Sequence, residues 1–222
     1  MSSHDLVLHG AAYSVYVRSV RLTLAEKGLD YRLEEVDLFG DPEARAAHRA
    51  LHPFEKMPVL EHGGFRLYET GAILRYLDAV FPEPALQPDD PQARARHDQV
   101  LSILDQYAYP QAVWGVYVPL SEAEQGNAPP PDTVALARAL ARSETVLDEL
   151  VRLTGAHPYW FADRPMLADL HALPMLTLFD ATEPGRDLLA ARPALVAWFE
   201  AMQARASVQD TTPRSGPRRD PA

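Results

Sequence analysis

Along residues 1–80 of the chain, apolar residues follow two different patterns, one typical of strands and one typical of helices. Residues 6–9 are typical of a short buried strand, whereas residues 14–27 repeat apolar side chains every three or four positions, which predicts an amphipathic helix. Gly28 follows and favours the end of that helix. A second strand is predicted at residues 31–36, and a helix at residues 42–51.

A β-hairpin is predicted for residues 59–68, because Gly63 and Gly64 suit the positive φ angles of a tight turn. A helix with one apolar face begins at Thr70. The order strand, helix, strand, helix, hairpin, helix is typical of a small α/β domain. Its first two strands are expected to be parallel and joined by a right-handed crossover.

Helical periodicity dominates the second half of the chain. Residues 82–91 contain four prolines and two aspartates, which is typical of a linker. Helices are predicted beyond this linker near residues 92–118, 132–154, 167–179 and 193–206. We therefore expect an α/β domain over residues 1–81 and an all-helical domain over residues 92–207, with a disordered tail at residues 208–222.

The composition narrows the possible partners and compartments. The 222 residues include 31 acidic and 21 basic side chains, for a net charge of -10, so no nucleic-acid partner is expected. The longest apolar runs are interrupted by charges and the N-terminus has no signal-peptide pattern, so we expect a cytoplasmic protein that enters no membrane. The eight histidines are scattered without ligand spacing, and no metal site is predicted.

The chain contains no cysteine. This excludes disulfide bonds, thiolate metal sites and a cysteine nucleophile within the chain, and with them a self-contained disulfide oxidoreductase. Any thiol chemistry must therefore come from a ligand.

The segment Lys56–Pro58, at the head of a predicted strand, allows two interpretations. A proline there most often marks a sheet edge or a turn, since it cannot donate a ladder hydrogen bond. If the Met57–Pro58 bond is instead cis, the backbone N–H and C=O of Met57 face outward and can pair with an extended, peptide-like ligand. The Lys56 ammonium would then reach a carboxylate of that ligand.

Glu69 and Thr70 stand at the entrance of a predicted helix. The first amides of a helix have no partner within it, and the helix dipole favours anions there. Thr70 can act simply as an N-cap. Alternatively, its hydroxyl and the amides bind a ligand carboxylate while Glu69 pairs with an adjacent ammonium, which would recognise an amino-acid head group.

Ser14 follows the first predicted strand and starts the first predicted helix. A hydroxyl together with a helix N-terminus would stabilise a thiolate and lower the pKa of a bound thiol. The simpler interpretation is again an N-cap serine. Tyr13 and Tyr16 offer competing hydroxyls, although each is more typical of packing or an interface.

These patterns together resemble the soluble glutathione transferases over nearly the whole chain, to about Ser207. The family's usual "NPFGKVP" and "ES" correspond to "HPFEKMP" at residues 52–58 and "ET" at residues 69–70. The spacing of Ser14 and the arginine and valine that follow it is similar to that of serine-type, phi-like and related bacterial members. "LADLHALPML", at residues 167–176, resembles the helix that starts the core of the family's C-terminal domain.

The resemblance implies an α/β thioredoxin-like N-terminal domain followed by an all-α helical-bundle C-terminal domain, and a homodimer. It implies glutathione as co-substrate, ionised with help from Ser14 so that its thiolate attacks a small hydrophobic electrophile. The residues that would bind glutathione are Lys56, Met57, cis Pro58, Glu69 and Thr70. Tyr13, Trp114 and Tyr117 are candidates for the electrophile pocket, although an aromatic cluster in a helical segment is more often core.

Three features depart from the family pattern. Glu55 stands in place of the usual glycine and His52 in place of the usual asparagine, which is expected to affect the loop between them and the next strand. Met166 replaces a serine or threonine N-cap three residues before Asp169, so half of a capping box is missing. The histidine–lysine pair that some members use for the glycine carboxylate of glutathione has no clear equivalent, and Glu43–Ala44 lies near its place.

Two other functions remain open on the same fold. A glutathione-dependent isomerase, lyase or dehalogenase would release the thiol after each turnover. A non-catalytic, transferase-like binding module is the other possibility, because the departures from the family pattern affect the site. Fold alone does not decide between them.

Overall fold

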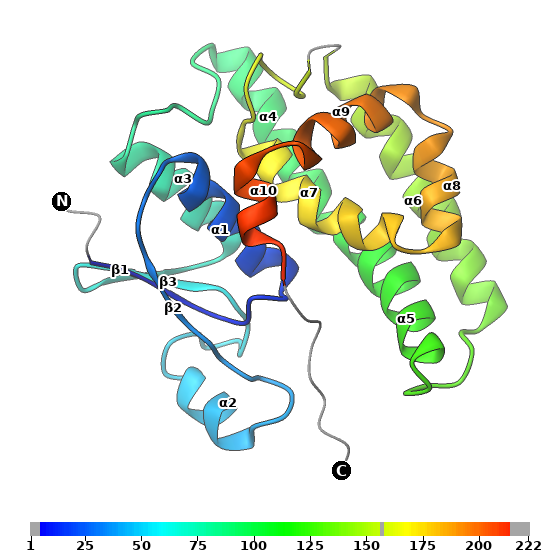
Figure 1. Cartoon of the computed structure of the whole chain (residues 1–222), viewed down its shortest axis with the longest axis horizontal. Coiled ribbons are helices and arrows are strands. Elements are labelled where there is room, and N and C mark those ends of the chain that lie inside the picture. The colour runs from blue at the N-terminus through cyan, green and yellow to red at the C-terminus, as the bar shows by residue number, and fades with distance from the viewer. Residues whose placement is uncertain (1–4, 156–157, 214–222) are drawn as a thin grey trace. The chain divides into compact units, whose positions relative to one another are not determined.

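The computed structural model describes residues 5–155 and 158–213, which divide into two compact units (Figure 1). The first unit combines the N-terminal residues up to Ala85 with the C-terminal residues from Arg205. The second unit spans Leu86–Ala204. The first is an α/β unit and the second is helical, which confirms the predicted fold class.

The first unit is built on a four-stranded mixed sheet with the strand order β2-β1-β3-β4. The strands are β1 (Leu6–His9), β2 (Arg32–Glu34), β3 (Val59–His62) and β4 (Phe65–Tyr68). β1 is parallel to β2 and antiparallel to β3, and β3 is antiparallel to β4. The predicted parallel first pair is therefore confirmed. Gly63 and Gly64 form the predicted hairpin turn, with φ angles of 55° and 85°.

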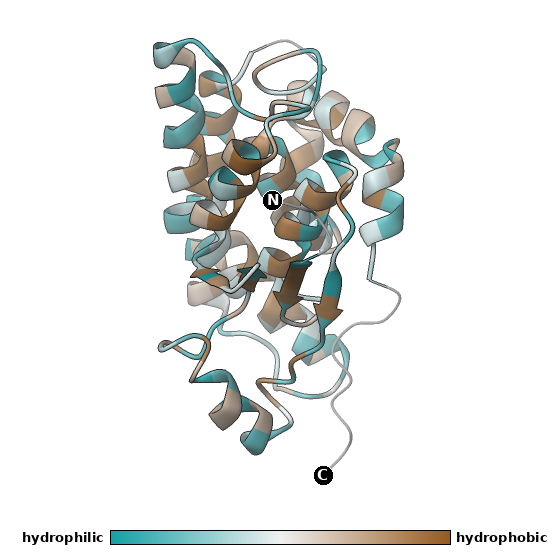
Figure 2. Cartoon of the chain, turned by 90° about the vertical axis from the view of Figure 1, so that its left-hand side faces the viewer, coloured by the Kyte–Doolittle hydropathy of each residue, from teal (hydrophilic) through white to brown (hydrophobic). Residues whose placement is uncertain are grey.

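The first unit also contains three helices, two before the β3–β4 hairpin in the sequence and one after it. They are α1 (Val15–Glu26), α2 (Pro42–His48) and α3 (Thr70–Val80). α1 and α3 pack on each other through their apolar faces. In β1, Leu6 and Leu8 are buried whereas Val7 and His9 are partly exposed, so one face of the strand is turned toward the core. Figure 2 shows the strands largely in the apolar colour.

The C-terminal segment returns to the first unit as helix α10 (Ala206–Thr211), which packs on α1. Arg205 donates from Nε and Nη2 to the two carboxylate oxygens of Glu26, at 2.7 Å each. The tail predicted at residues 208–222 thus begins inside a helix, because long-range contacts with α1 order it. Residues 214–222 lie outside the described residues.

Arg18 connects the middle of α1 to the same C-terminal segment. Its side chain is buried and donates to the Val208 carbonyl at 3.4 Å and to Thr212 Oγ1 at 3.1 Å. Arg21 donates to the Thr211 carbonyl at 3.1 Å. Burial, with a smaller contribution from the neighbouring Arg21 charge, lowers the pKa of Arg18 to about 10. The guanidinium is therefore a buried cation whose Nη2 donates to neutral acceptors, whereas its buried Nε has no hydrogen-bond partner among the described residues.

The second unit contains no strand among its described residues. Its elements are α4 (Pro91–Ile103), the π-helix η2 (Leu104–Tyr117), α5 (Val118–Glu124), α6 (Thr133–Leu153), α7 (Leu167–Asp180), α8 (Glu183–Ala190) and α9 (Pro193–Gln203). The single helix predicted near residues 92–118 is thus two consecutive elements, α4 and η2, with Pro110 inside the π-helix, and the prediction ended where α5 begins. α8 was not predicted. Within the described residues, no helix is long and apolar enough to cross a membrane.

The start of α7 shows how the chain replaces the missing N-cap hydroxyl. Met166 is the N-cap, and the carboxylate of Asp169 accepts its backbone N–H at 2.8 Å. The same carboxylate accepts the Trp160 N–H at 3.0 Å and the Trp198 Nε1–H at 2.7 Å. Asp169 is fully buried, and this burial raises its pKa to about 6. One carboxylate therefore begins the helix and ties it to two other segments.

Candidate active site

The predicted glutathione residues come from segments that the sheet brings to one end. His9, Val59 and Tyr68 lie side by side across β1, β3 and β4 in the sheet register. β1 and β4 end at this row and β3 begins there, so the loop before α1, the Met57–Pro58 segment and the start of α3 meet at the same end of the sheet. A direct contact agrees with this placement, since the Ala11 N–H lies 3.2 Å from Met57 Sδ.

Ser14 is the N-cap of α1, with φ of -66° and ψ of 130°. Its Oγ accepts a hydrogen bond from the Val17 N–H at 3.5 Å, which is the long limit for such a bond. The side chain is partly exposed, and within the described residues its O–H donates to no acceptor. The capping role therefore uses one lone pair of the oxygen and leaves the hydroxyl hydrogen available.

Glu35 is a charged neighbour of this loop to which the sequence did not point. It follows β2, and both of its carboxylate oxygens lie 3.3 Å from the Ala12 N–H, two residues before Ser14. Only the parallel pairing of β1 with β2 brings these positions together. The carboxylate adds negative charge near a helix N-terminus, the position where the dipole favours an anion.

The Met57–Pro58 peptide bond is cis, as the resemblance implies. Within residues 5–155 and 158–213, neither the N–H nor the C=O of Met57 makes a hydrogen bond. The Lys56 carbonyl accepts a hydrogen bond from His48 Nε2 at 2.7 Å. The Lys56 side chain is exposed. The unpaired backbone N–H and C=O of Met57 and the exposed Lys56 ammonium therefore lie just before β3.

The N-terminus of α3 is open. Glu69 is its N-cap, in the left-handed region with φ of 69°, and its side chain makes no capping hydrogen bond. Thr70 is the first helical residue and not the N-cap, and its side chain is only 7% exposed. In the described part of the chain, the N–H groups of Thr70 and Gly71 find no acceptor. The amides, the Thr70 hydroxyl and the exposed Glu69 carboxylate thus remain available to a ligand.

His52 packs among aromatic rings in the loop that leads to Lys56, and its Nδ1 accepts the Phe54 N–H at 3.3 Å. It is buried, and its ring centroid lies 4.6 Å from that of Tyr68 and 6.0 Å from that of Phe54. Burial lowers the pKa of His52, and the nearby Glu69 carboxylate partly opposes this effect. The replacement of the family's asparagine therefore adds aromatic packing behind the candidate site.

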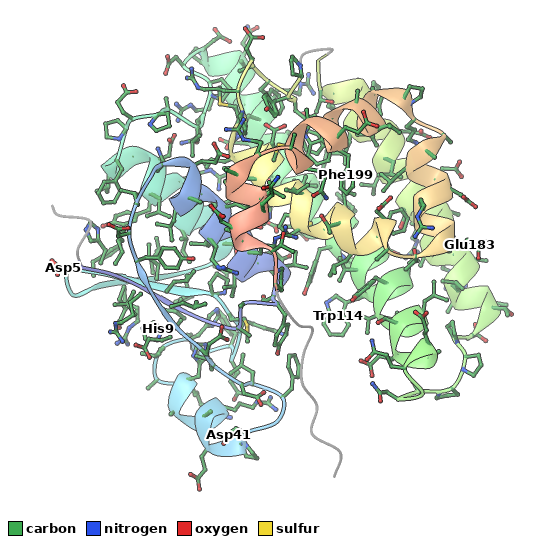
Figure 3. The ribbon with its side chains drawn as sticks, viewed as in Figure 1. Asp5, His9, Asp41, Trp114, Glu183 and Phe199 are labelled. Carbon is green, nitrogen blue, oxygen red and sulfur yellow. The ribbon has the colours of Figure 1, made fainter. Side chains whose placement is uncertain are left out.

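The aromatic candidates for an electrophile pocket belong to different units. Tyr13 is partly exposed in the first unit, as is Tyr16, the alternative hydroxyl. Trp114, labelled in Figure 3, is 52% exposed on the π-helix of the second unit, and Tyr117 at the end of this helix is partly exposed. Burial raises the pKa of Tyr109 on the same helix. Trp114 and Tyr117 are thus not core residues within their unit.

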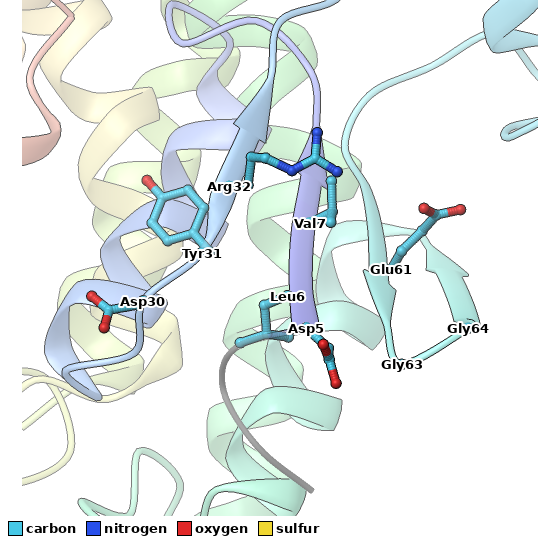
Figure 4. Close-up of a pocket in the computed structure, with 9 residues that line it drawn as sticks. All are labelled: Asp5, Leu6, Val7, Asp30, Tyr31, Arg32, Glu61, Gly63 and Gly64. Atoms are coloured by element: carbon cyan, nitrogen blue, oxygen red, sulfur yellow. The ribbon is translucent and has the colours of Figure 1, made fainter.

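A hollow of about 560 Å³ lies at the opposite end of the sheet (Figure 4). Asp5, Arg32, Glu61 and the Gly63–Gly64 turn are among its lining residues, and none of the predicted site residues lines it. It is therefore separate from the row of segments described above. Elsewhere too, as far as the chain is described, no three histidine or acidic side chains lie close enough together to hold a metal ion.

The sequence and the fold were compared with those of known proteins. Residues 8–85 match the family model of the glutathione S-transferase N-terminal domain, and residues 133–201 match that of the C-terminal domain. Glutathione S-transferase F14 of Arabidopsis thaliana is 33% identical over 185 residues, which cover 81% of this chain and 72% of that relative. Maleylacetoacetate isomerase of Pseudomonas aeruginosa is 31% identical over 160 residues, which cover 71% and 73% respectively.

Solved structures show the same architecture. The crystal structure of glutathione transferase F7 from Populus trichocarpa superposes with a TM-score of 0.80 at 26% sequence identity. The match covers 93% of this chain and 97% of that one, so it includes both units.

Proposed function

Because this chain belongs to the glutathione S-transferase family and is a glutathione transferase, we propose that Ser14 helps to ionise the thiol of bound glutathione. The thiol proton passes to solvent, and the thiolate attacks a small hydrophobic electrophile to form a carbon–sulfur bond, while an electron pair moves onto the electrophile in an addition or departs with the leaving group in a substitution. One observation supports this proposal. The Ser14 hydroxyl, the unpaired backbone groups of Met57 and the open N-terminus of α3 all lie at the same end of the sheet.

The γ-glutamyl end of glutathione carries a carboxylate next to an ammonium, and the start of α3 offers the complementary groups. The Thr70 hydroxyl and the N–H groups of Thr70 and Gly71 would donate to the carboxylate. The Glu69 carboxylate would accept from the ammonium. An exposed acid and unpaired amides at one helix end support this assignment.

The middle of glutathione is an extended peptide, which suits the head of β3. The N–H and C=O of Met57 would pair with the cysteinyl backbone as an added strand does, while Pro58 shapes this edge. The Lys56 ammonium would pair with the remaining carboxylate at the glycyl end. This pairing would place the cysteinyl sulfur near the loop that contacts Met57 and carries Ser14.

Ser14 and the N-terminus of α1 would stabilise the thiolate by a hydrogen bond and by the helix dipole. Each unit by which they lower the thiol pKa corresponds to about 1.4 kcal/mol. The Glu35 carboxylate opposes this stabilisation, because a like charge disfavours the thiolate. The helix end, the hydroxyl and the acid together would set the pKa of the bound thiol.

Tyr13, Trp114 and Tyr117 are the aromatic residues that we propose for electrophile binding. Such a pocket recognises area and shape through apolar contacts, with few polar groups to fix orientation. The exposure of Trp114 and Tyr117 within their own unit supports the assignment.

We expect a cytoplasmic homodimer. The Phe54 side chain is 67% exposed although it belongs to a packed loop, where it lies edge-on to Tyr68 at 6.4 Å between ring centroids. Exposed aromatic side chains held in place in this way are typical anchors of protein interfaces. Light scattering on the Phe54→Ala variant tests this role, and a wild-type mass of 24.7 kDa would count against the dimer.

Ultraviolet difference spectroscopy of bound glutathione, titrated with pH, tests the central proposal. We expect a thiolate signal near neutral pH in the wild type that moves to higher pH in Ser14→Ala. Tyr13→Phe and Tyr16→Phe are the matched controls and should titrate as the wild type does. A shift in either tyrosine variant but not in Ser14→Ala would assign the activating hydroxyl to that tyrosine.

The likeness to maleylacetoacetate isomerase favours one second candidate, a glutathione-dependent isomerase on the same site. In that reaction the thiolate adds to the substrate and later leaves, so glutathione is regenerated. A screen that recovers all of the glutathione after substrate turnover would support the isomerase, whereas stoichiometric consumption supports conjugation. Saturable glutathione binding without an ionised thiol would instead indicate a binding module.

A further inference from the structure

Glu55 occupies a backbone conformation that normally favours glycine. Its φ is 52°, in the left-handed region, at the position where the family pattern has glycine. A side chain disfavours this region because Cβ approaches the neighbouring carbonyl oxygen. The loop before Lys56 therefore keeps the backbone shape that glycine would give, although the residue is an acid. Contacts with other residues are therefore needed to keep Glu55 in this conformation.

Arg45 of α2 and Arg49 at the C-cap of this helix hold the Glu55 carboxylate. Arg45 Nε donates to Glu55 Oε2 at 2.5 Å, and Arg49 Nε donates to Oε1 at 2.6 Å, with a second contact from Arg49 Nη2 to the same oxygen. The Glu55 side chain is only 14% exposed. These hydrogen bonds lower the pKa of Glu55 below its usual value, so the carboxylate is ionised at neutral pH.

A third side chain, that of His48 at the end of α2, contacts the residue that follows Glu55 in the loop. His48 is buried, and its Nε2 lies 2.7 Å from the Lys56 carbonyl oxygen. Because a carbonyl only accepts, Nε2 carries the hydrogen of this bond. His48 and Arg49 come three and four positions after Arg45, the spacing that places each of them on the same side of the helix as Arg45. That side therefore contacts Glu55 and Lys56 together.

α2 itself is short, and its N-cap is Asp41, labelled in Figure 3, whose side chain accepts the N–H groups of Glu43 at 2.9 Å and Ala44 at 3.1 Å. A helix of this length is not stable by itself and depends on contacts with its surroundings. The contacts with Glu55 and Lys56 therefore stabilise α2 as well as the loop.

We propose that Glu55 is a positioning residue for glutathione: with Arg45 and Arg49 it forms an ionic clamp that fixes the backbone leading into Lys56 and Met57. This inference rests on the proposed function. The clamp orders the backbone edge before the ligand arrives, so that binding does not have to order it. At the position where the family pattern has glycine, which adopts a positive φ readily, this chain stabilises the same conformation through the bound Glu55 carboxylate.

The test compares Glu55→Gln and Glu55→Gly with the wild type. Glutamine keeps the length of the side chain but loses the charge, and glycine keeps the backbone shape but loses the clamp. We expect both to raise the dissociation constant of glutathione about three- to tenfold, measured by calorimetry. The KM for glutathione should rise similarly, while kcat at saturating glutathione stays within about twofold, because Ser14 is untouched.

Glu43→Gln is the matched control, since it removes one acidic charge from α2 without touching the clamp. The double variant Arg45→Gln with Arg49→Gln should reproduce the loss, and adding Glu55→Gln to it should change little more, as expected for groups that act together. Amide hydrogen exchange of residues 54–57, measured without ligand, should be faster in both Glu55 variants.

Wild-type affinity and wild-type exchange in Glu55→Gln would overturn the clamp while leaving the proposed function intact. Wild-type protein that binds no glutathione would overturn the proposed function, and with it the role of the clamp in binding. Additive losses from the arginine and Glu55 substitutions would also contradict a single clamp.

Discussion

The helices α1 and α3 begin at the same end of the sheet, but one N-terminus is capped by its own side chain and the other is open. At α1, Ser14 Oγ accepts the Val17 N–H at 3.5 Å. At α3, Glu69 occupies the N-cap with φ of 69°, and its side chain caps no amide. Since the first amides of a helix need partners from outside it, α3 offers donors that α1 has partly used.

This difference suits two different groups of one ligand, the cysteinyl thiolate and the γ-glutamyl carboxylate. Ser14 accepts with a lone pair and still has a hydrogen to give, which fits a single thiolate sulfur. The N–H groups of Thr70 and Gly71 with the Thr70 hydroxyl fit a carboxylate, which accepts several hydrogen bonds at once. The positive φ of Glu69 is a strained conformation of the kind that clusters at ligand sites. The two helix ends therefore have different tasks in one site.

Removal of the Ser14 hydroxyl is the strongest test of the capped end. We expect Ser14→Ala to lower kcat/KM at neutral pH about a hundredfold, the loss seen when one donor to a developing anion is removed. The variant should have a higher bound-thiol pKa, so the deficit should shrink as pH rises through that value and the thiol ionises unaided. A pH–rate profile with a model electrophile measures both. A deficit that stays constant at all pH values would contradict a role in ionisation.

The open end is tested by Thr70→Val, which keeps the shape of the side chain and removes its hydroxyl. We expect the affinity for glutathione to fall about tenfold or more, because a hydrogen bond to a charged group is lost in a buried place. Calorimetry measures the dissociation constant, and Thr145→Val on the exposed face of α6 is the matched control. Unchanged affinity in Thr70→Val would mean that the end of α3 binds no carboxylate.

α1 also differs from α3 in carrying the C-terminal helix α10. The Glu26 side chain is 9% exposed and pairs with Arg205, which is 30% exposed. We expect Glu26→Gln to lower the free energy of unfolding of the first unit by about 1–2 kcal/mol, since a largely buried charge pair is broken. Urea denaturation measures this change.

The control for Glu26→Gln is Glu149→Gln, which breaks the exposed pair with Arg152 on α6. It should change stability by no more than about 0.5 kcal/mol. Equal effects of the two substitutions would show that α10 is not held on α1 by its ion pair.

The sequence predicted the four strands and the helix that begins at Thr70, because these elements depend on local patterns. The glycine pair fixes the hairpin, and the apolar spacing after Thr70 fixes the helix. It did not predict that Glu69, and not Thr70, is the N-cap. Nothing in the residue type shows that a glutamate adopts a positive φ, since that conformation is imposed by its surroundings.

Other elements were missed because long-range contacts or an unusual helical period determine them. α10 is ordered by Arg205 and Arg18 contacts with partners far away in the sequence. Residues 104–117 carry an apolar pattern without the 3.6-residue repeat, so the π-helix was read as part of one α-helix. The candidate site residues stood out because hydroxyls, an acid and a lysine occur at element ends, whereas Glu35 follows a strand without any such signal.

Glu35→Gln is the mildest test of the difference between the two helix ends. Glutamine keeps an oxygen that can accept the Ala12 N–H but removes a negative charge near the start of α1. We expect the pKa of the bound thiol to fall, because less negative charge opposes the thiolate, and kcat/KM below that pKa to rise about twofold at low salt. Added salt should reduce the gain, since exposed charges are screened. Lower activity in Glu35→Gln, with Glu43→Gln unchanged, would show that the carboxylate supports the Ser14 loop more than it opposes the thiolate.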